Sequence, residues 1–373
     1  MIAAATLHAL SIPFRERFRH AAADRAACDS VVVRVVDRDG CQGWGEGAPR
    51  PHVTGETVDT VLADLAAAWP AVTSTPPPYL ERPADLARLA LPAGLRGAAR
   101  AALELAVLDI LLRRAGRSLA SLLPARRSEV RYSGVVGAVA AGRARGIAEV
   151  FRAYRIADVK VKVGFPGDLE SVRAVRAALG PRATIRVDAN GAWRPSEALS
   201  AIARLADHGV ECVEQPLPRG AVAELAALRA RSPLPLMADE SLVTAADARE
   251  LAAAGAVDHF NIRVSKCGGL GPCLAIAAVA RDAGIGVQVG CQAGETAILS
   301  AAGRHFAAGV ERLLHAEGSF GEALLVEDLG HAPVMFGAGG EAPLLTGPGL
   351  GIEVDAERVR RWTRRTVELG ALR

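Results

Sequence analysis

The sequence predicts an α/β protein built on a (β/α) barrel of the TIM type, with a smaller α+β domain over the barrel mouth. Its 373 residues suffice for a barrel of about 200 to 250 residues plus a second domain. From about residue 128, Val/Ile-rich runs alternate with Ala/Leu-rich segments of helical length, which indicates βαβ units and a parallel sheet. Polar residues that close these runs recur once per βα unit. An open sheet would spread them along an edge, whereas a barrel would gather them at one mouth.

The N-terminal region, residues 1–127, is predicted to form the α+β capping domain. The segment DSVVVRVVDRDGCQGWGEG predicts an antiparallel hairpin with Asp39 and Gly40 at its turn. Helices are expected over TVDTVLADLAAAW and RGAARAALELAVLDILLRRAG.

The next region, residues 128–323, is predicted to form the barrel. RYSGVVG supplies the first strand and ERLLHAE the eighth. The intervening strands are expected in ADVKVKVG, TIRVDAN, ECVEQP, PLMADES and HFNIRVSK, each followed by an Ala/Leu-rich helix.

The tail, residues 324–373, is rich in Gly and Pro and then carries VDAERVRRWTRRTVEL, which we predict to be a last helix. We expect the tail to rejoin the N-terminal region and complete the capping domain. The arginines of this segment are interpreted as a solvated helix face.

The polar residues that close the predicted strands are almost evenly spaced. Lys162, Asp188, Glu214, Asp239 and Lys266 are separated by 26, 26, 25 and 27 residues. One βα unit occupies about that length, so these side chains should stand at the carboxyl ends of successive strands.

Three of these residues are carboxylates on neighbouring strands: Asp188, Glu214 and Asp239. Three anions at one mouth repel each other unless a cation joins them, and an all-oxygen set with room for water suits Mg²⁺. Helix caps or arginine partners would be the structural explanation for a single carboxylate, but the regular spacing of all three favours the metal.

The chain has only three lysines among its 44 basic residues: Lys160, Lys162 and Lys266. Arginine does not release its proton in a protein, whereas a crowded or desolvated lysine becomes a base near neutral pH. Lys160 and Lys162 lie two apart on one strand, so both point into the barrel, and their crowding is expected to lower one pKa. Lys266 lies four units further round the ring and would face a substrate from the opposite side.

Composition and charge argue against nucleic-acid-binding, membrane and secreted proteins. The net charge of +3 is too small to indicate a nucleic-acid partner. No apolar run approaches the roughly 18 residues of a membrane span, and the first residues lack the pattern of a secretory signal. The six scattered cysteines, without CxxC, are typical of free thiols in a reducing compartment. We therefore expect a cytoplasmic protein with no membrane partner.

Five motifs, VKVKVG, VDAN, VEQP, ADES and SKCGG, occur in an order and spacing that resemble the muconate lactonising enzyme subgroup of the enolase superfamily. The resemblance covers essentially the whole chain and implies the modified barrel of that superfamily, a Mg²⁺ cofactor that Mn²⁺ can replace, a small-molecule carboxylate substrate and a homo-oligomer. The mandelate racemase subgroup would place a His at the seventh strand. Here that segment reads VQVGCQAGET, which disfavours it.

The resemblance also assigns roles to individual residues. Lys162 would be the acid or base on one face of the substrate and Lys266 its counterpart on the other. Lys160 would lower the pKa of Lys162 and help neutralise an enolate, and Asn190 would orient ligands from nearby. The remaining three residues, Asp188, Glu214 and Asp239, would bind Mg²⁺.

The implied chemistry is removal of the proton beside a carboxylate, which gives an enolate stabilised by Mg²⁺ and the lysines. Two lysines on opposite faces favour racemisation or epimerisation of an N-acylated amino acid or a related α-substituted carboxylate. Muconate-type cycloisomerisation and a syn elimination of the o-succinylbenzoate synthase type remain open alternatives. A non-catalytic barrel that only binds a ligand is the rival from another class.

Residues outside the five motifs are candidates for contacts with the substrate. Specificity is expected to come from two segments, FRHAAADRAACDS, which contains His20 and Arg25, and GAPRPHVTGE, which contains His52. Arg25 is expected to pair with a distal carboxylate. Glu295 is expected to touch substrate or hold Lys266. Family members that epimerise dipeptides carry Asp-x-Asp on the eighth strand, and Glu317 begins the corresponding Glu-Gly-Ser here.

Overall fold

The computed structural model describes residues 2–20, 23–74, 78–89 and 91–370. At its centre lies an eight-stranded parallel sheet in which the strands follow the order of the sequence, from β5 to β12. The strands are β5 (Gly134–Val136), β6 (Asp158–Lys162), β7 (Thr184–Asp188), β8 (Val210–Glu214), β9 (Leu236–Ala238), β10 (His259–Arg263), β11 (Gly286–Gly290) and β12 (Leu313–Ala316).

The sheet curls until its two ends meet. The N–H of Ser133, just before β5, donates to the carbonyl of Ala316 in β12 at 2.8 Å. The α/β barrel of the predicted fold class is therefore confirmed.

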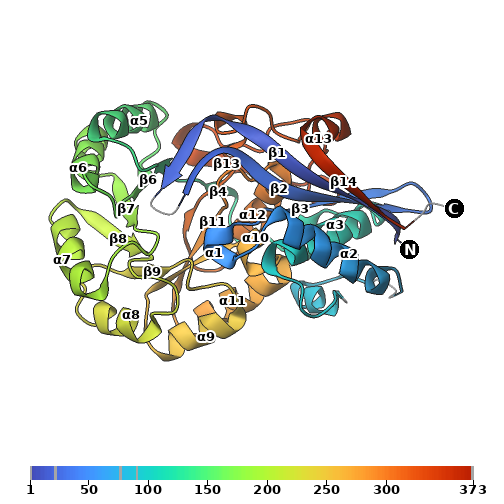
Figure 1. The fold of residues 1–373 in the computed structure, drawn as a ribbon, viewed down its shortest axis with the longest axis horizontal. Helices are drawn as coiled ribbons and strands as arrows, with labels where there is room; N and C mark the ends of the chain where they lie inside the picture. The colour runs from blue at the N-terminus through green and yellow to red at the C-terminus, as the bar shows by residue number, and fades with distance from the viewer. Residues whose placement is uncertain (1, 21–22, 75–77, 90, 371–373) are drawn as a thin grey trace.

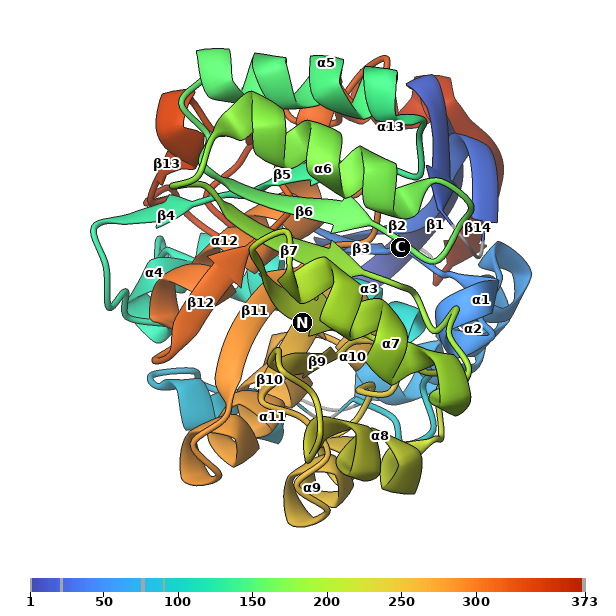
Figure 2. The ribbon, with the colours of Figure 1, turned by 90° about the vertical axis from the view of Figure 1, so that its left-hand side faces the viewer.

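Helices follow the strands around the outside of the barrel (Figure 2). They are α5 (Ala141–Ala153), α6 (Asp168–Leu179), α7 (Pro195–Ala206), α8 (Val222–Arg229), α9 (Ala245–Ala253), α10 (Val264–Cys267), α11 (Leu270–Asp282) and α12 (Ala297–Gly309). Because helices cover one face of the sheet and the barrel interior lies on the other, strand residues of both parities are buried.

The parallel register brings the carboxyl ends of the strands level with one another. Lys162 lies beside Asp188, and Asp188 lies beside Glu214, in adjacent strands. The strand alignment alone therefore places these three side chains at one rim of the barrel.

A second, antiparallel sheet lies above the barrel in the strand order β14, β1, β2, β3 (Figure 1). Its strands are β1 (Ile2–His20), β2 (Ala23–Asp37), β3 (Gln42–Gly47) and β14 (Thr363–Leu369). The predicted hairpin between β2 and β3 is confirmed, and Gly40 takes the left-handed conformation, φ 83°, in its turn.

Helices α2 (Val58–Ser74) and α3 (Gly97–Arg114) contact this sheet. The smaller elements are α1 (Pro51–Thr54), η1 (Pro83–Arg88), α4 (Leu119–Leu122), β4 (Glu129–Arg131), η2 (Gly321–Ala323), η3 (Ala338–Gly340) and β13 (Glu341–Pro343). No helix in the described part of the chain is both long enough and apolar enough to cross a bilayer.

The end of the chain corrects one prediction. The segment predicted as a single last helix forms α13 (Ala356–Trp362) and then turns into β14, which pairs antiparallel with β1. The β-branched Thr363, Thr366 and Val367 suit a strand, and the free edge of β1 supplies hydrogen bonds that a longer helix would leave unmade. Red β14 therefore lies beside blue β1 in Figure 1.

The strand β3 packs against α3 so closely that side chains are excluded at alternate positions. A Cβ atom on Gly45 would lie 2.0 Å from the carbonyl oxygen of Ala102 in α3, which is backbone and cannot move aside. We predict that Gly45→Ala lowers the free energy of unfolding by about 3 kcal/mol. Gly146→Ala is the control, because no atom lies within 4 Å of that position in α5; it is expected to raise stability by about 0.5 kcal/mol. Urea unfolding of both variants measures the difference, and equal effects would contradict this packing.

A buried histidine makes stability depend on pH. His305 in α12 is 4% exposed, its Nε2 lies 3.1 Å from the carbonyl oxygen of Leu350, and burial lowers its pKa from 6.5 to about 4. The unfolded chain therefore binds more protons between pH 6.5 and pH 4, so this residue makes stability fall as pH falls through that window. We predict that His305→Gln removes about 3 kcal/mol of this acid destabilisation. Urea titrations of both proteins at pH 7.5 and pH 4.5 measure this difference. An equal loss of unfolding free energy in the two proteins would argue against a neutral His305.

Candidate active site

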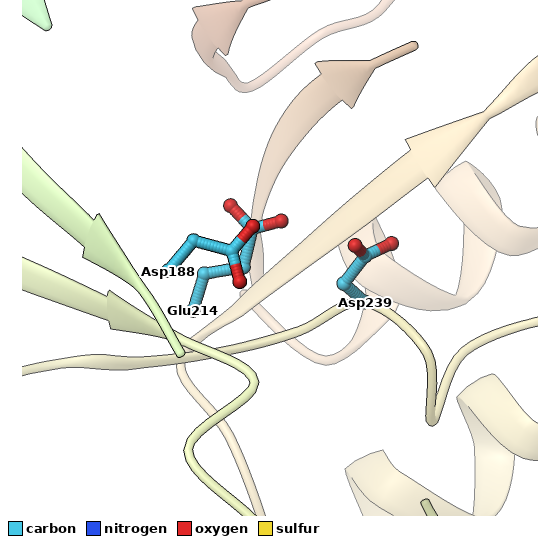
Figure 3. Close-up of side chains that lie close together, drawn as sticks. All are labelled: Asp188, Glu214 and Asp239. Atoms are coloured by element: carbon cyan, nitrogen blue, oxygen red, sulfur yellow. The ribbon is translucent and has the colours of Figure 1, made fainter. Parts of the chain in front are cut away.

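Three buried carboxylates form the centre of the site at the carboxyl end of the barrel. Asp188 ends β7, Glu214 ends β8, and Asp239 follows β9 by one residue. One oxygen from each lies within 4.8 Å of the others, and all three side chains are inaccessible to solvent. Figure 3 shows the carboxylates directed into one shared space. Such an all-oxygen donor set fits a hard divalent cation.

Two of the lysines approach this cluster from β6. Lys162 Nζ lies 2.5 Å from Asp188 Oδ2, and Lys160 Nζ lies 3.1 Å from Glu214 Oε2. Both ammonium groups are buried, so the carboxylates are the partners that stabilise their charge.

Lys266 reaches the cluster from the other side. It lies in the short helix α10, three residues beyond β10, and so does not end the strand as predicted. Its Nζ donates to the carbonyl and the Oδ1 of Asp239, both at 2.7 Å, and to the carbonyl of Asn261 at 2.9 Å. The lysines thus flank the three carboxylates, which come from the βα units between them.

Lys160 and Lys266 have opposite pKa shifts. Burial disfavours the ammonium form of Lys160, but Glu214, Glu317 and Asp188 outweigh burial and hold the pKa of Lys160 above its usual value. The lowering of the Lys162 pKa by Lys160 stays a prediction. Burial does lower the pKa of Lys266, to about 8.

Arg263 at the end of β10 is a site residue that the sequence argument missed. Its guanidinium forms an ion pair with Asp239, lies 3.6 Å from Glu214 Oε1, and donates to Gln292 at 3.1 Å. The signal was present in the strand HFNIR, where Asn261 and Arg263 alternate and therefore point to the same face.

Glu317 lies immediately after β12 inside the same buried network. One oxygen is 2.6 Å from Lys160 Nζ, and the other is 2.6 Å from the guanidinium of Arg186. Both carboxylate oxygens therefore already have a cationic partner within the protein.

Asn190 links Lys162 to a further carboxylate. Its Oδ1 accepts from Lys162 at 2.9 Å, and its Nδ2 donates to Glu240 Oε1 at 3.0 Å. Glu240 is buried next to Asp239 and was also missed, because nothing in the sequence distinguishes it from an ordinary loop glutamate.

A cavity of about 790 Å³ opens above the site between the barrel and the capping domain. Lys160, Lys162, Asn190 and Glu317 line it from the barrel, and Arg25, Arg50 and His52 line it from the N-terminal region. Burial and the nearby cations Arg50, Arg25, Arg263 and Lys162 lower the pKa of His52 to about 4. The side chain of His20, the other histidine considered, lies outside the described residues.

Glu295 is held by a backbone N–H group, and no described contact joins it to Lys266. It lies five residues beyond β11, and its Oε1 accepts from the backbone N–H of Gln292 at 2.6 Å. It is absent from the residues that line the large cavity, and among the described contacts Lys266 has other partners.

A barrel whose mouth holds three buried carboxylates between lysines on opposite sides belongs to the class of enzymes that stabilise an enolate. The chain matches the enolase C-terminal domain-like model over residues 142–359 and the mandelate racemase / muconate lactonizing enzyme N-terminal domain model over residues 5–124. The chain therefore belongs to the enolase superfamily, as the five motifs predicted.

Several relatives are similar over nearly their whole length. A hydrophobic dipeptide epimerase of Enterococcus faecalis is 33% identical, covering 93% of this chain and 98% of the relative. Muconate cycloisomerase 1 of Rhodococcus opacus is 32% identical, with 95% and 96% covered. The crystal structure of an N-succinyl Arg/Lys racemase from Bacillus cereus superimposes with a TM-score of 0.89 at 26% identity, with 99% of each chain covered. These relatives are isomerases, and the chain is an enzyme of that kind.

Proposed function

We propose that this enzyme racemises or epimerises an N-acylated amino acid, or a closely related α-substituted carboxylate, through an enolate. The observation that carries the proposal is the placement of Lys162 and Lys266 on opposite sides of three buried carboxylates. A substrate held over the carboxylate cluster would meet a proton donor or acceptor on either face, which inversion at one carbon requires.

Asp188, Glu214 and Asp239 would hold Mg²⁺, or Mn²⁺ in its place. The fit rests on the donor set, because three buried carboxylates within ligand distance of one another offer only hard oxygen atoms. When bound, the cation would supply positive charge where the substrate carboxylate becomes an enolate.

The remaining steps belong to side chains of the chain. Lys162 removes the α-proton on one face, and Lys266 delivers a proton to the other face; the reverse assignment converts the opposite enantiomer. Lys160, held as an ammonium by Glu214 and Glu317, adds positive charge beside the developing enolate.

The ion pairs of Glu317 favour a substrate whose α-nitrogen is acylated. A free α-ammonium needs an unpaired carboxylate at the eighth strand, but both oxygens of Glu317 are already paired with Lys160 and Arg186. A neutral amide nitrogen needs no carboxylate partner.

The cationic lining from the N-terminal region supports a second anionic group on the substrate. Arg50 is 3% exposed and donates to the carbonyls of Asp29, Pro49 and Ala293 rather than to a described carboxylate. Arg25 lines the same part of the cavity, so an anion on the acyl group would find two guanidinium groups there.

Incubation with enantiopure N-succinyl and N-acetyl amino acids, free dipeptides and cis,cis-muconate, followed by chiral chromatography, tests the proposal. Inversion of an N-acyl amino acid, faster for succinyl than for acetyl derivatives, is expected. Lactone or alkene formation without inversion would instead establish cycloisomerisation or elimination and overturn the racemase assignment.

A further inference from the structure

The two candidate base lysines are held very differently. Lys266 Nζ has three close acceptors, two of which are backbone carbonyls that cannot rotate away. Lys162 Nζ has two side-chain acceptors among the described residues, Asp188 and Asn190. Asp188 is also a candidate metal ligand, so Asn190 is the acceptor that Lys162 does not share with a cation.

Asn190 is in turn oriented by carboxylates. An ammonium group donates hydrogen bonds and accepts none, so the amide oxygen of Asn190 faces Lys162. The NH₂ group then lies 3.0 Å from Glu240 Oε1 and 3.4 Å from Asp188 Oδ2. The backbone fixes the position of Asn190 as well, because its φ of 45° is left-handed and its N–H donates to Asp188 Oδ1 at 2.9 Å.

Glu240 is buried, and one of its two carboxylate oxygens has no described hydrogen-bond partner. Glu240 is 8% exposed, and its Oε2 has no hydrogen-bond partner among the described residues. Within the same residues it forms no ion pair. Burying a carboxylate with an unpaired oxygen lowers the stability of the folded state. This cost indicates that the hydrogen bond to Asn190 has a role in the site.

We propose that Glu240 is a positioning residue that holds Lys162 in place through Asn190 and therefore serves one face of the substrate only. The inference rests on the proposed function, since it assigns Lys162 to one face and Lys266 to the other. Among the described residues no hydrogen bond links Glu240 to Lys266, whose acceptors belong to Asp239 and Asn261. Glu240 acts on Lys266 through its charge and does not hold the ammonium group in place.

Exchange of the α-proton in D₂O, measured separately for the two enantiomers of the fastest N-succinyl amino acid, tests the proposal in the Mg²⁺-loaded enzyme. Lys162→Ala first identifies the enantiomer whose exchange depends on Lys162. Glu240→Leu is expected to slow that enantiomer about tenfold or more relative to the other, because small misplacements of a base are costly. Glu240→Gln, which keeps an acceptor for Asn190, should retain the wild-type ratio to within roughly threefold.

Asn190→Gly provides a second route if Glu240→Leu folds poorly, since glycine tolerates the left-handed backbone. It should slow the same enantiomer, and adding Glu240→Leu should cost little more, as expected for residues in one chain of contacts. Equal slowing of both enantiomers by either variant would overturn the proposal.

A readout independent of turnover comes from the lysine content of the chain. With only three lysines, protein labelled with ¹³C at the lysine ε-carbon gives three signals, which single-lysine variants assign. Glu240→Leu is expected to shift or broaden the Lys162 signal and leave that of Lys266 in place. An unmoved Lys162 signal overturns the proposal. A wild-type enzyme that exchanges neither enantiomer overturns the proposed function, while the signals still decide the role of Glu240.

Discussion

Lys162→Ala is expected to slow racemisation by about a hundredfold to ten-thousandfold, the range typical of losing a general acid or base. Lys162 Nζ lies 2.5 Å from Asp188 Oδ2, and the side chain lines the cavity. Lys160, the other lysine of β6, is paired with Glu214 and Glu317 and is therefore not expected to replace Lys162. Chiral chromatography measures the loss, and calorimetry should show Mg²⁺ binding preserved.

Lys266→Ala is the matched variant for that experiment. It should abolish racemisation to a similar degree but spare α-proton exchange in the enantiomer that Lys162→Ala loses. Full activity in Lys162→Ala, or loss of the same enantiomer in both variants, would remove the two-base assignment.

Asp239→Asn is expected to weaken Mg²⁺ binding at least tenfold, about 1.4 kcal/mol, because it removes one of the three proposed anionic ligands while keeping the size of the side chain. The side chain is fully buried and contacts Arg263 and Lys266, so the variant also leaves those cations with a weaker partner. Calorimetric titration with MgCl₂ measures the affinity.

Asp207→Asn is the control for this titration, since Asp207 is exposed at the C-terminal end of α7 and outside the carboxylate cluster. It should bind Mg²⁺ as the wild type does. An unchanged affinity in Asp239→Asn would argue that the cluster is held by lysine and arginine alone.

The fold was predictable because the barrel strands are short apolar runs closed by polar residues at a regular interval. The register between β6, β7 and β8 then brings Lys162, Asp188 and Glu214 together, as the spacing indicated. The last helix was wrong because pairing with β1, almost the whole chain away, overrides the local helical pattern from Thr363 onward.

The spacing predicted which carboxylates and lysines of the candidate site meet, but it missed Arg263 and Glu240 and did not predict the electrostatics. Spacing identifies which residues meet, but it does not say that Glu317 pairs with Arg186 or that Arg263 occupies the carboxylate cluster. Those contacts join strands on different sides of the barrel, and they decide the direction in which a buried pKa moves. The cytoplasmic location and the homo-oligomer remain predictions.

The most direct test is proton NMR of an N-succinyl amino acid incubated with the enzyme in D₂O, with MgCl₂ and with EDTA. Loss of the α-proton signal is expected with MgCl₂ and retention with EDTA, because Asp188, Glu214 and Asp239 would then lack a cation to stabilise the enolate. Retention of the α-proton across all N-acyl amino acids, dipeptides and muconates by an enzyme that still binds Mg²⁺ would contradict it and indicate a barrel that only binds its ligand.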